Sequence, residues 1–332
     1  MLWQPPDLAA GGVVLVVACV VALFPHAVTS ADPMRTGGVP LQPPSSTHPL
    51  GTDELGRDLW SNLVHGTRTS LAVGVLATTL GTSIGVAVGA VAGYHGGFWD
   101  EGLMRLAELV QIVPRFLLAL LLVALFGSRL SVLTLVIAAT TWPVVARVVR
   151  SEVLSLRQRD FVVAARAVGA RDARVIARHL LPNALPAVLI GAPVQVGRAI
   201  VLEAGLSFLG LGDRATASWG SLLQSAQSYL RDAWWLAVFP GGALTLVVLA
   251  LFGITEGLHR LYTPGWSSPS APVDGPLAPA PVPPVVPQRT GAGSRLWQEQ
   301  SPQVQRSPKR VRSTRRSRSA WSRGRLYRSS GR

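Results

Sequence analysis

The feature that most constrains the fold of this chain is a recurrence of apolar blocks of roughly 17 to 25 residues, the length an α-helix needs to cross a bilayer. The chain has 332 residues, 14% of them charged, and a mean hydropathy of +0.35, which is too apolar for a soluble domain of this size. Because backbone groups in lipid must be satisfied internally, we expect each block to be helical. The sequence therefore predicts an all-α membrane protein with spans at Leu8 to Phe24, Ser70 to Ala92, Leu106 to Phe126, Leu130 to Val149, Ala184 to Ala204 and Trp235 to Leu258.

Two of these blocks carry residues that predict local geometry. The second block contains Gly81, Gly85 and Gly89 at intervals of four, and small residues at this spacing let two helices approach closely. We expect this face to pack against protein rather than lipid. In the third block, Pro114 is expected to kink the helix, because proline removes a backbone donor and clashes with the preceding turn.

The blocks divide the chain into a first transmembrane helix (1–27), an extracytoplasmic segment (28–69), a core of five further spans (70–262) and a tail (263–332). An alternative interpretation makes the first block a secretory signal, because the small residues Val28 to Ala31 that follow it resemble a cleavage site. The absence of a basic residue before Leu8 argues against cleavage.

The net charge of +14 is concentrated in the tail, where thirteen basic and two acidic residues follow Gly265. A Pro/Ala stretch (Ser267 to Pro287) and a Ser/Arg stretch (Gln288 to Arg332) have too few apolar residues to offset the entropy of ordering, so disorder is predicted. The tail could bind anionic lipid or nucleic acid, or it could be an extension without a function. We expect membrane lipid as a partner of the chain and do not expect nucleic acid.

A second basic region lies between the fourth and fifth blocks, in the segment Glu152 to Asn183, called here the Arg-rich loop. The positive-inside rule places such a loop in the cytoplasm. Counting spans from it places the N-terminus and the tail inside, and 28–69 and 206–232 outside. The arginines of the loop and its flank are Arg147, Arg150, Arg157, Arg159, Arg166, Arg171, Arg174 and Arg178.

The Arg-rich loop is too charged to span a membrane, yet its apolar residues recur at mostly helical intervals. This pattern predicts a pair of amphipathic helices at the membrane surface. Gly169 is expected to form the turn between them and Pro182 to end the second helix. The small residues Ala164, Ala165 and Ala167 would let one face of the first helix enter a groove.

The loop resembles the EAA loop of ABC-importer permeases. The similarity lies in Ala164-Ala165, then Gly169 after three residues, and His179-Leu180-Leu181-Pro182 after nine more, with Val163 in place of the family's leading acidic residue. In that family the loop contains a coupling helix that inserts into a cleft of the ATPase subunit. The resemblance therefore implies ATPase coupling through Val163, Ala164, Ala165, Gly169, His179, Leu181 and Pro182.

Further motifs are similar to the C-type permease subunit of the dipeptide/oligopeptide/nickel branch. They are His48 to Asp58, Leu103-Met104-Arg105, Trp142-Pro143, Ala146-Arg147, His179 to Asn183, Glu203 to Gly212 and Ser218-Trp219-Gly220. The similarity runs from about His48 to about Gly253, whereas Thr255 to Arg260 and the basic tail depart from the branch.

This resemblance implies the six-helix fold of type I ABC importers, in a bacterial cell membrane. Its implied partners are a homologous permease subunit forming a heterodimer, two ABC ATPase subunits and an extracytoplasmic solute-binding protein. ATP and magnesium would be bound by the ATPase subunits, with no cofactor on this chain. The implied solute is a peptide or a similar molecule, with nickel as an alternative.

Charged residues within the blocks are candidates for the translocation path, because an ionised side chain in a bilayer costs about 2.5 to 3.5 kcal/mol on insertion scales. Glu108, Arg198 and Glu203 are such candidates, as is the carbonyl-exposing kink at Pro114; Arg115 and Glu203 could instead extend toward an interface. The apolar segment with Phe208, together with Trp219, is expected to pack at an outer gate.

The outer segment before the second block contains Asp53, Glu54, Arg57 and Asp58, which we expect to dock the solute-binding protein. An equally supported interpretation is a solvated segment in which Thr52 and Asp53 cap the following helix.

No enzymatic constellation is found. The sequence has no G-x-x-x-x-G-K-[ST], H-E-x-x-H or G-x-S-x-G motif, its histidines are scattered, and its single cysteine, Cys19, lies in the first block. The chain is therefore predicted to be a transport subunit rather than an enzyme. The alternatives are a self-contained secondary transporter and a membrane-anchored lipid or nucleic-acid binder acting through its tail.

Overall fold

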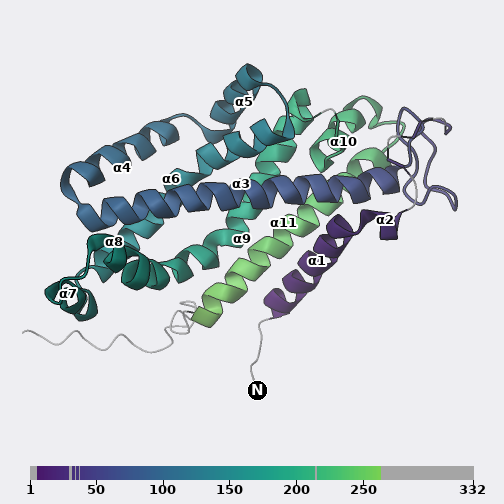
Figure 1. Ribbon diagram of the computed structural model, residues 1–332. Helices are drawn as coiled ribbons and strands as arrows, with labels where there is room; N and C mark the ends of the chain where they lie inside the picture. Colours follow the sequence, from purple (N-terminus) through teal and green to yellow (C-terminus); the bar gives the residue numbers. More distant parts are fainter. Residues whose placement is uncertain (1–5, 30–31, 34, 37, 214, 263–332) are drawn as a thin grey trace, which may run out of the picture. The chain divides into compact units, whose positions relative to one another are not determined.

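The computed structural model describes residues 6–29, 32–33, 35–36, 38–213 and 215–262, and this part of the chain is helical apart from loops and one isolated bridge between Thr52 and Asp58 (Figure 1). The predictions of a disordered and lipid-binding tail concern residues 263–332, which lie outside the described residues. The long helices are α1 (Pro6–Leu23), α3 (Leu59–His95), α4 (Gly97–Ile112), α5 (Arg115–Phe126), α6 (Leu130–Leu156), α9 (Leu181–Leu206) and α11 (Trp235–Tyr262). The short ones are α2 (Pro25–Val28), α7 (Asp160–Ala167), α8 (Asp172–Val175), α10 (Trp219–Ala226), the π-helical turns η1 (Ile176–Leu180) and η2 (Ser207–Leu211), and the 3₁₀ turn η3 (Gln227–Tyr229).

Four stretches of continuous helix in the described part are long and apolar enough to cross a membrane: α3, α6, α11 and the run Asp172–Leu211 that includes α9. They confirm the second, fourth, fifth and sixth predicted spans. The apolar part of α1, Leu8–Leu23, is shorter. At about 1.5 Å per residue it reaches roughly 24 Å, against a hydrocarbon core of about 30 Å. The first span therefore stays a prediction.

The third predicted span is broken. Helices α4 and α5 meet at a bend of 85°, and Val113 and Pro114 between them have extended ψ angles of 130° and 127°. Proline disfavours the helical conformation of the residue before it, which explains why α4 ends at Ile112. The kink predicted at Pro114 is confirmed, whereas a single helix over Leu106 to Phe126 is wrong.

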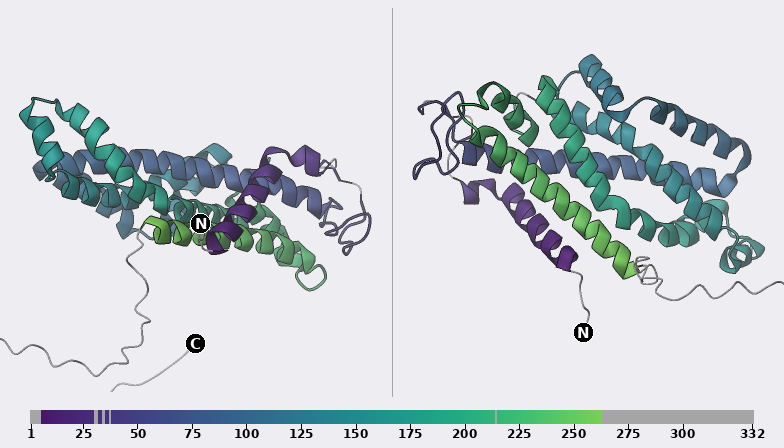
Figure 2. Two further views of the ribbon diagram at one scale, coloured as in Figure 1. Left: turned by 90° about the horizontal axis from the view of Figure 1, so that it is seen from below. Right: turned by 180° about the vertical axis from the view of Figure 1, so that it is seen from behind.

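The glycine face of α3 packs against α6, which runs alongside it in Figures 1 and 2. A Cβ atom added to Gly85 would lie 2.6 Å from the Cβ of Val145 and 2.7 Å from the carbonyl oxygen of Trp142. At Gly93, one turn beyond the predicted ridge, it would lie 2.9 Å from the carbonyl oxygen of Arg150. The predicted close helix approach is confirmed, and it extends to the end of α3.

Helix α1 lies along α11, as the views in Figures 1 and 2 show. Ala18 of α1 and Val247 and Leu251 of α11 share a buried apolar cluster with Ile200 and Trp219. One face of the first apolar block therefore packs against the bundle.

The end of the Arg-rich loop differs from the prediction. Pro182 does not end the second loop helix, because α8, η1 and α9 form one continuous helix through it. Pro182 lies at the start of α9, directly after a π-helical turn in this continuous helix. The wide π-helical turn before it closes with a bond from the Leu181 N–H group to the carbonyl oxygen of Ile176.

Candidate functional site

The first loop helix, α7, and the continuous helix that starts at α8 are joined by a tight turn at Gly169. This residue has a φ of +84°, in the left-handed region that favours glycine. Its N–H group donates to the carbonyl oxygen of Arg166 at 2.9 Å, and the N–H group of Ala170 donates to the carbonyl oxygen of Ala165 at 3.1 Å. The predicted turn at Gly169 is therefore confirmed, whereas the helix that follows it is the long run Asp172–Leu211 and not a short helix.

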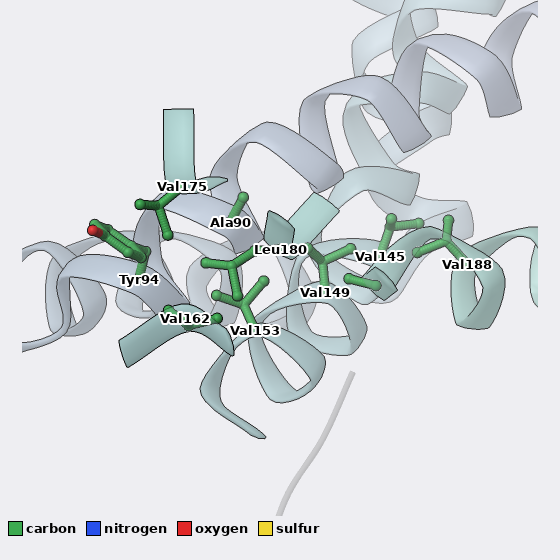
Figure 3. Packing of buried hydrophobic residues seen from close by; sticks show 10 residues of the cluster. Ala90, Tyr94, Val145, Val149, Val153, Val162, Val175, Leu180 and Val188 are labelled. Carbon is green, nitrogen blue, oxygen red and sulfur yellow. The ribbon is translucent and has the colours of Figure 1, made fainter. Parts of the chain in front are cut away.

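One face of α7 is anchored in the core. Val162 is fully buried and shares a cluster with Val175 of α8, Leu180 of η1 and Tyr94 of α3 (Figure 3). Ala90 of α3, valines of α6, and Ala184 and Val188 of α9 complete this cluster. The loop thus rests on the ends of two long helices and does not extend freely from them.

The opposite face of α7 is exposed and apolar. Phe161 is 43% exposed, Val163 56% and Val168, just after the helix, 89%. Of the small residues predicted to enter a groove, Ala164 is exposed and Ala165 is half-buried. An exposed apolar face on a helix whose other face is anchored is typical of a protein-binding surface.

The remaining predicted coupling residues lie on the second arm of the loop. His179 is in η1, and Leu181 and Pro182 are in the first turn of α9, so the structure does not bring them onto the exposed face of α7. The carbonyl oxygen of His179 accepts a bond from the Asn183 side chain at 2.6 Å. The buried residue of this stretch is Leu180, which belongs to the motif but is not among the predicted coupling residues.

Tyr94, at the end of α3, contacts both arms of the loop and is missed by sequence reasoning. Its hydroxyl group donates to Asp172 Oδ1 at 2.5 Å, and the guanidinium carbon of Arg166 lies 4.7 Å from the centre of its ring. Arg157 donates to the carbonyl oxygens of Gly93 and Tyr94 at 3.2 and 3.4 Å. From the sequence, Arg157 and Arg166 serve only to predict which side of the membrane the loop is on. In the structure they also attach the loop to α3.

An ion pair ties α6 to the start of α4. The guanidinium group of Arg150 donates to both carboxylate oxygens of Asp100, with a distance of 2.6 Å from Nη2 to Oδ2. Such a bidentate pair fixes the relative orientation of the two side chains in addition to pairing their charges.

The predicted path and gate residues fall into two groups. Glu203 and Trp219 are both about 1% exposed and are linked through Ser70, whose Oγ donates to Glu203 Oε2 at 3.4 Å and accepts from the Trp219 backbone N–H group at 3.2 Å. Ser207 Oγ also donates to Glu203, at 2.6 Å. Glu203 therefore bonds within the bundle, and the suggestion that it extends toward an interface is wrong.

The other predicted path residues do not join this network. Glu108 and Arg198 are exposed on α4 and α9, Pro114 is exposed at the α4–α5 break, and Phe208 in η2 is 39% exposed. A buried nitrogen of Arg115, Nη2, has no hydrogen-bond partner in the described part of the chain.

The outer segment before α3 is ordered by its own acidic residues. Asp53 Oδ1 accepts from the backbone N–H groups of Leu55 and Arg57 at 2.9 and 2.7 Å. Burial raises the pKa of the Asp53 carboxyl group above its ordinary value, although these two N–H groups act in the opposite direction. Glu54 and Arg57 are half-buried beside it.

The residue that caps α3 is Asp58, whose Oδ2 accepts from the Ser61 N–H group at 2.9 Å while Oδ1 contacts His48 Nδ1 at 3.0 Å. Capping by Thr52 and Asp53 is therefore wrong: the Thr52 hydroxyl group donates to the Val39 carbonyl oxygen at 2.8 Å. The cap also explains why α3 begins at Leu59 and not at the predicted Ser70. Docking of a binding protein at this segment stays a prediction.

No group of three or more His, Cys, Asp and Glu side chains is placed to hold a metal ion among the described residues. The surfaces that stand out are instead the apolar face of α7 and the outer segment, which lie at opposite ends of α3 (Figure 1).

Comparison with known proteins identifies the class. A family model described as "Binding-protein-dependent transport system inner membrane component" matches residues 85–267. The dipeptide transport system permease protein DppC of Alkalihalophilus pseudofirmus is 36% identical over 264 residues, which cover 79% of this chain and 87% of that protein. A putative peptide transport system permease protein of Brucella suis biovar 1 is 38% identical over 256 residues, covering 76% and 86%.

The chain therefore belongs to the family of binding-protein-dependent transport system inner membrane components. It is a membrane transport permease and not an enzyme, and the predicted family is confirmed. Among solved structures, the MetNI methionine ABC transporter in an inward-facing conformation has a TM-score of 0.49 and 19% identity, covering 61% of this chain and 95% of that chain.

Proposed function

We propose that this chain is one of two homologous permease subunits that together form the translocation path of an ATP-driven importer for peptides or similar solutes. The solute class is supported by the relatives, which are named as dipeptide and peptide permeases. Membership of a binding-protein-dependent family favours this function over a self-contained secondary transporter.

The observation that carries the proposal is the anchored helix α7 with its exposed apolar face. Val162 holds one side of the helix in the core, while Phe161, Val163 and Val168 face outward. When an ATPase subunit bound to this surface moves, α7 moves with it and displaces the helices against which it packs. Two such ATPase subunits, holding ATP and Mg²⁺, would bind this loop and its equivalent in the second permease.

The charge distribution supports the proposed orientation. The Arg-rich loop carries the densest run of arginine among the described connections, so the positive-inside rule places α7 in the cytoplasm. The outer segment at the other end of α3 would then face the extracytoplasmic side, where a solute-binding protein docks. In this orientation the N-terminus and the tail are cytoplasmic.

Exposed charges on the spanning helices support a second permease subunit. Glu108 and Arg198 are exposed, and a charge facing lipid costs about 2.5 to 3.5 kcal/mol on insertion scales. We infer that these faces meet the homologous subunit or a water-filled path between the two subunits.

Placing a charge on the outer face of α7 is expected to remove ATPase binding. The Val163→Asp substitution puts a carboxylate on the proposed apolar contact, where its desolvation would be uncompensated. Co-purification of tagged permease with the ATPase subunits should fall at least tenfold, a loss of about 1.4 kcal/mol or more. The matched control is Leu230→Asp, at an exposed apolar residue between α10 and α11. Undiminished ATPase recovery with Val163→Asp would contradict the proposal.

A second substitution tests the turn. Gly169→Val forces a β-branched residue to a φ of +84°, which costs on the order of 1–2 kcal/mol and displaces α7. We expect transport-coupled ATP hydrolysis to be abolished while insertion into the membrane is kept. The control is Gly102→Val, at an exposed helical position where an added Cβ meets no atom within 4 Å. Full coupling in the Gly169 variant would rule out this role for the turn.

A further inference from the structure

Helix α3 connects the two ends of the protein without a break. It has 37 residues, which at about 1.5 Å per residue give a length of roughly 55 Å, against a hydrocarbon core of about 30 Å. Asp58 caps its first turn within the outer segment, and Tyr94 lies in its last turn beneath the Arg-rich loop. Figure 1 shows these two regions at opposite ends of the same helix.

The outer end of α3 is held firmly to the outer segment. Asp58 bonds to both the Ser61 N–H group and His48, and the Leu59 N–H group donates to the Gly51 carbonyl oxygen at 3.0 Å. Leu59 is also buried in a cluster with Trp235 and Leu236 of α11. A displacement of the outer segment is therefore transmitted to α3.

The inner end of α3 is held by Tyr94, which joins three elements. Its hydroxyl group bonds to Asp172, which starts the continuous helix leading into α9, and its ring lies under Arg166 at the end of α7. Figure 3 shows the Tyr94 ring beside Val175 within the buried cluster. The hydrogen bond to the carboxylate oxygen is more directional than the apolar contacts around it.

We propose that Tyr94 is a positioning residue which fastens both arms of the Arg-rich loop to α3, so that α3 transmits motion between the outer segment and α7 as one rigid element. The inference rests on the proposed function, and it adds the residue through which the outer and inner sites are coupled. Helices with intact hydrogen-bond ladders are stiff, whereas α7 alone is short and is joined to its neighbours by turns at both ends.

The test uses the complete transporter in liposomes, with both permease subunits, the ATPase subunits and the solute-loaded binding protein. Tyr94→Phe keeps the ring and its packing but removes the bond to Asp172, and Asp172→Ala removes the same bond from the other side. We measure ATP hydrolysis with and without the binding protein, because the ratio of the two rates reports on coupling between the sites. The control is Tyr262→Phe, an exposed tyrosine at the end of α11.

Each single variant is expected to lower the stimulation of ATP hydrolysis by the binding protein about fivefold or more, with the unstimulated rate unchanged. The double variant should be no worse than either single one, because all three lose the same bond. Undiminished stimulation in Tyr94→Phe, additive losses in the double variant, or an equal fall of both rates would each overturn the positioning role. If the unsubstituted chain itself fails to bind the ATPase subunits, the proposed function fails with it; binding without an effect of Tyr94→Phe contradicts only the inference.

Discussion

Replacing Gly85 with leucine is expected to prevent α3 from packing against α6 and to abolish the recovery of folded protein. Even a Cβ atom at this position would lie 2.6 Å from Val145 and 2.7 Å from a main-chain oxygen of Trp142, and backbone atoms cannot move aside as a flexible side chain can. Overpacking by a few methyl groups costs about 1–3 kcal/mol, and leucine would separate the two helices along the whole glycine face. The smaller Gly85→Ala change adds only this Cβ atom and should already lower both the yield and the thermal unfolding midpoint, by less than leucine does.

The measurement is the yield of monodisperse protein in detergent and its thermal unfolding midpoint. Gly191→Leu is the matched control, because Gly191 is a helical glycine of α9 where an added Cβ meets no atom within 4 Å. It should leave the yield near that of the unsubstituted protein. A normal yield of the Gly85→Leu protein would show that the α3–α6 contact does not determine the fold.

The second large effect is expected at Glu203, the buried acceptor that joins α3, α9 and η2. In Glu203→Leu the hydroxyl groups of Ser70 and Ser207 lose their carboxylate partner in a site from which water is excluded. Each unsatisfied buried group costs about 1–3 kcal/mol. Ser70 also holds the backbone N–H group of Trp219, so the first turn of α10 should loosen as well.

Glu203→Gln is the control, because an amide keeps an acceptor oxygen and almost the same volume. Thermal unfolding midpoints should rank the unsubstituted protein first, the glutamine variant second and the leucine variant last. Hydrogen exchange should show earlier opening around residues 218–222 in the leucine variant. If the leucine variant proves as stable as the glutamine variant, the hydrogen bonds that residue 203 accepts from Ser70 and Ser207 do not stabilise the protein.

Local features of the sequence predict the geometry of this protein well where neighbours along the chain decide it. Pro114 fixes its own φ and disfavours the helical conformation of Val113, so the break between α4 and α5 could be expected, although its 85° angle could not. Gly169 lacks a side chain that would oppose a positive φ, and the spacing of Gly81, Gly85 and Gly89 is a property of one helix. The expected match to a permease family likewise rests on consecutive motifs.

Two of the wrong predictions share a cause. Pro182 was expected to end a helix because proline usually does, but a π-helical turn before it removes the conflict. Thr52 and Asp53 were expected to cap α3, yet folding of the outer segment leaves Asp58 as the cap. In both cases the tertiary context chose between two local conformations that the sequence allows.

The sequence by itself determined the class of this protein: apolar blocks of membrane-spanning length, an Arg-rich loop and the permease motifs are all readable from residues close together in the chain. Only the tertiary structure decided which residues hold the Arg-rich loop against α3 and which residues bond to the buried Glu203. Tyr94 meets Asp172 across 78 residues, and Ser70 meets Glu203 across 133. Hydropathy and local spacing carry no information on such pairs, because the contacts form only when helices distant in the chain pack side by side.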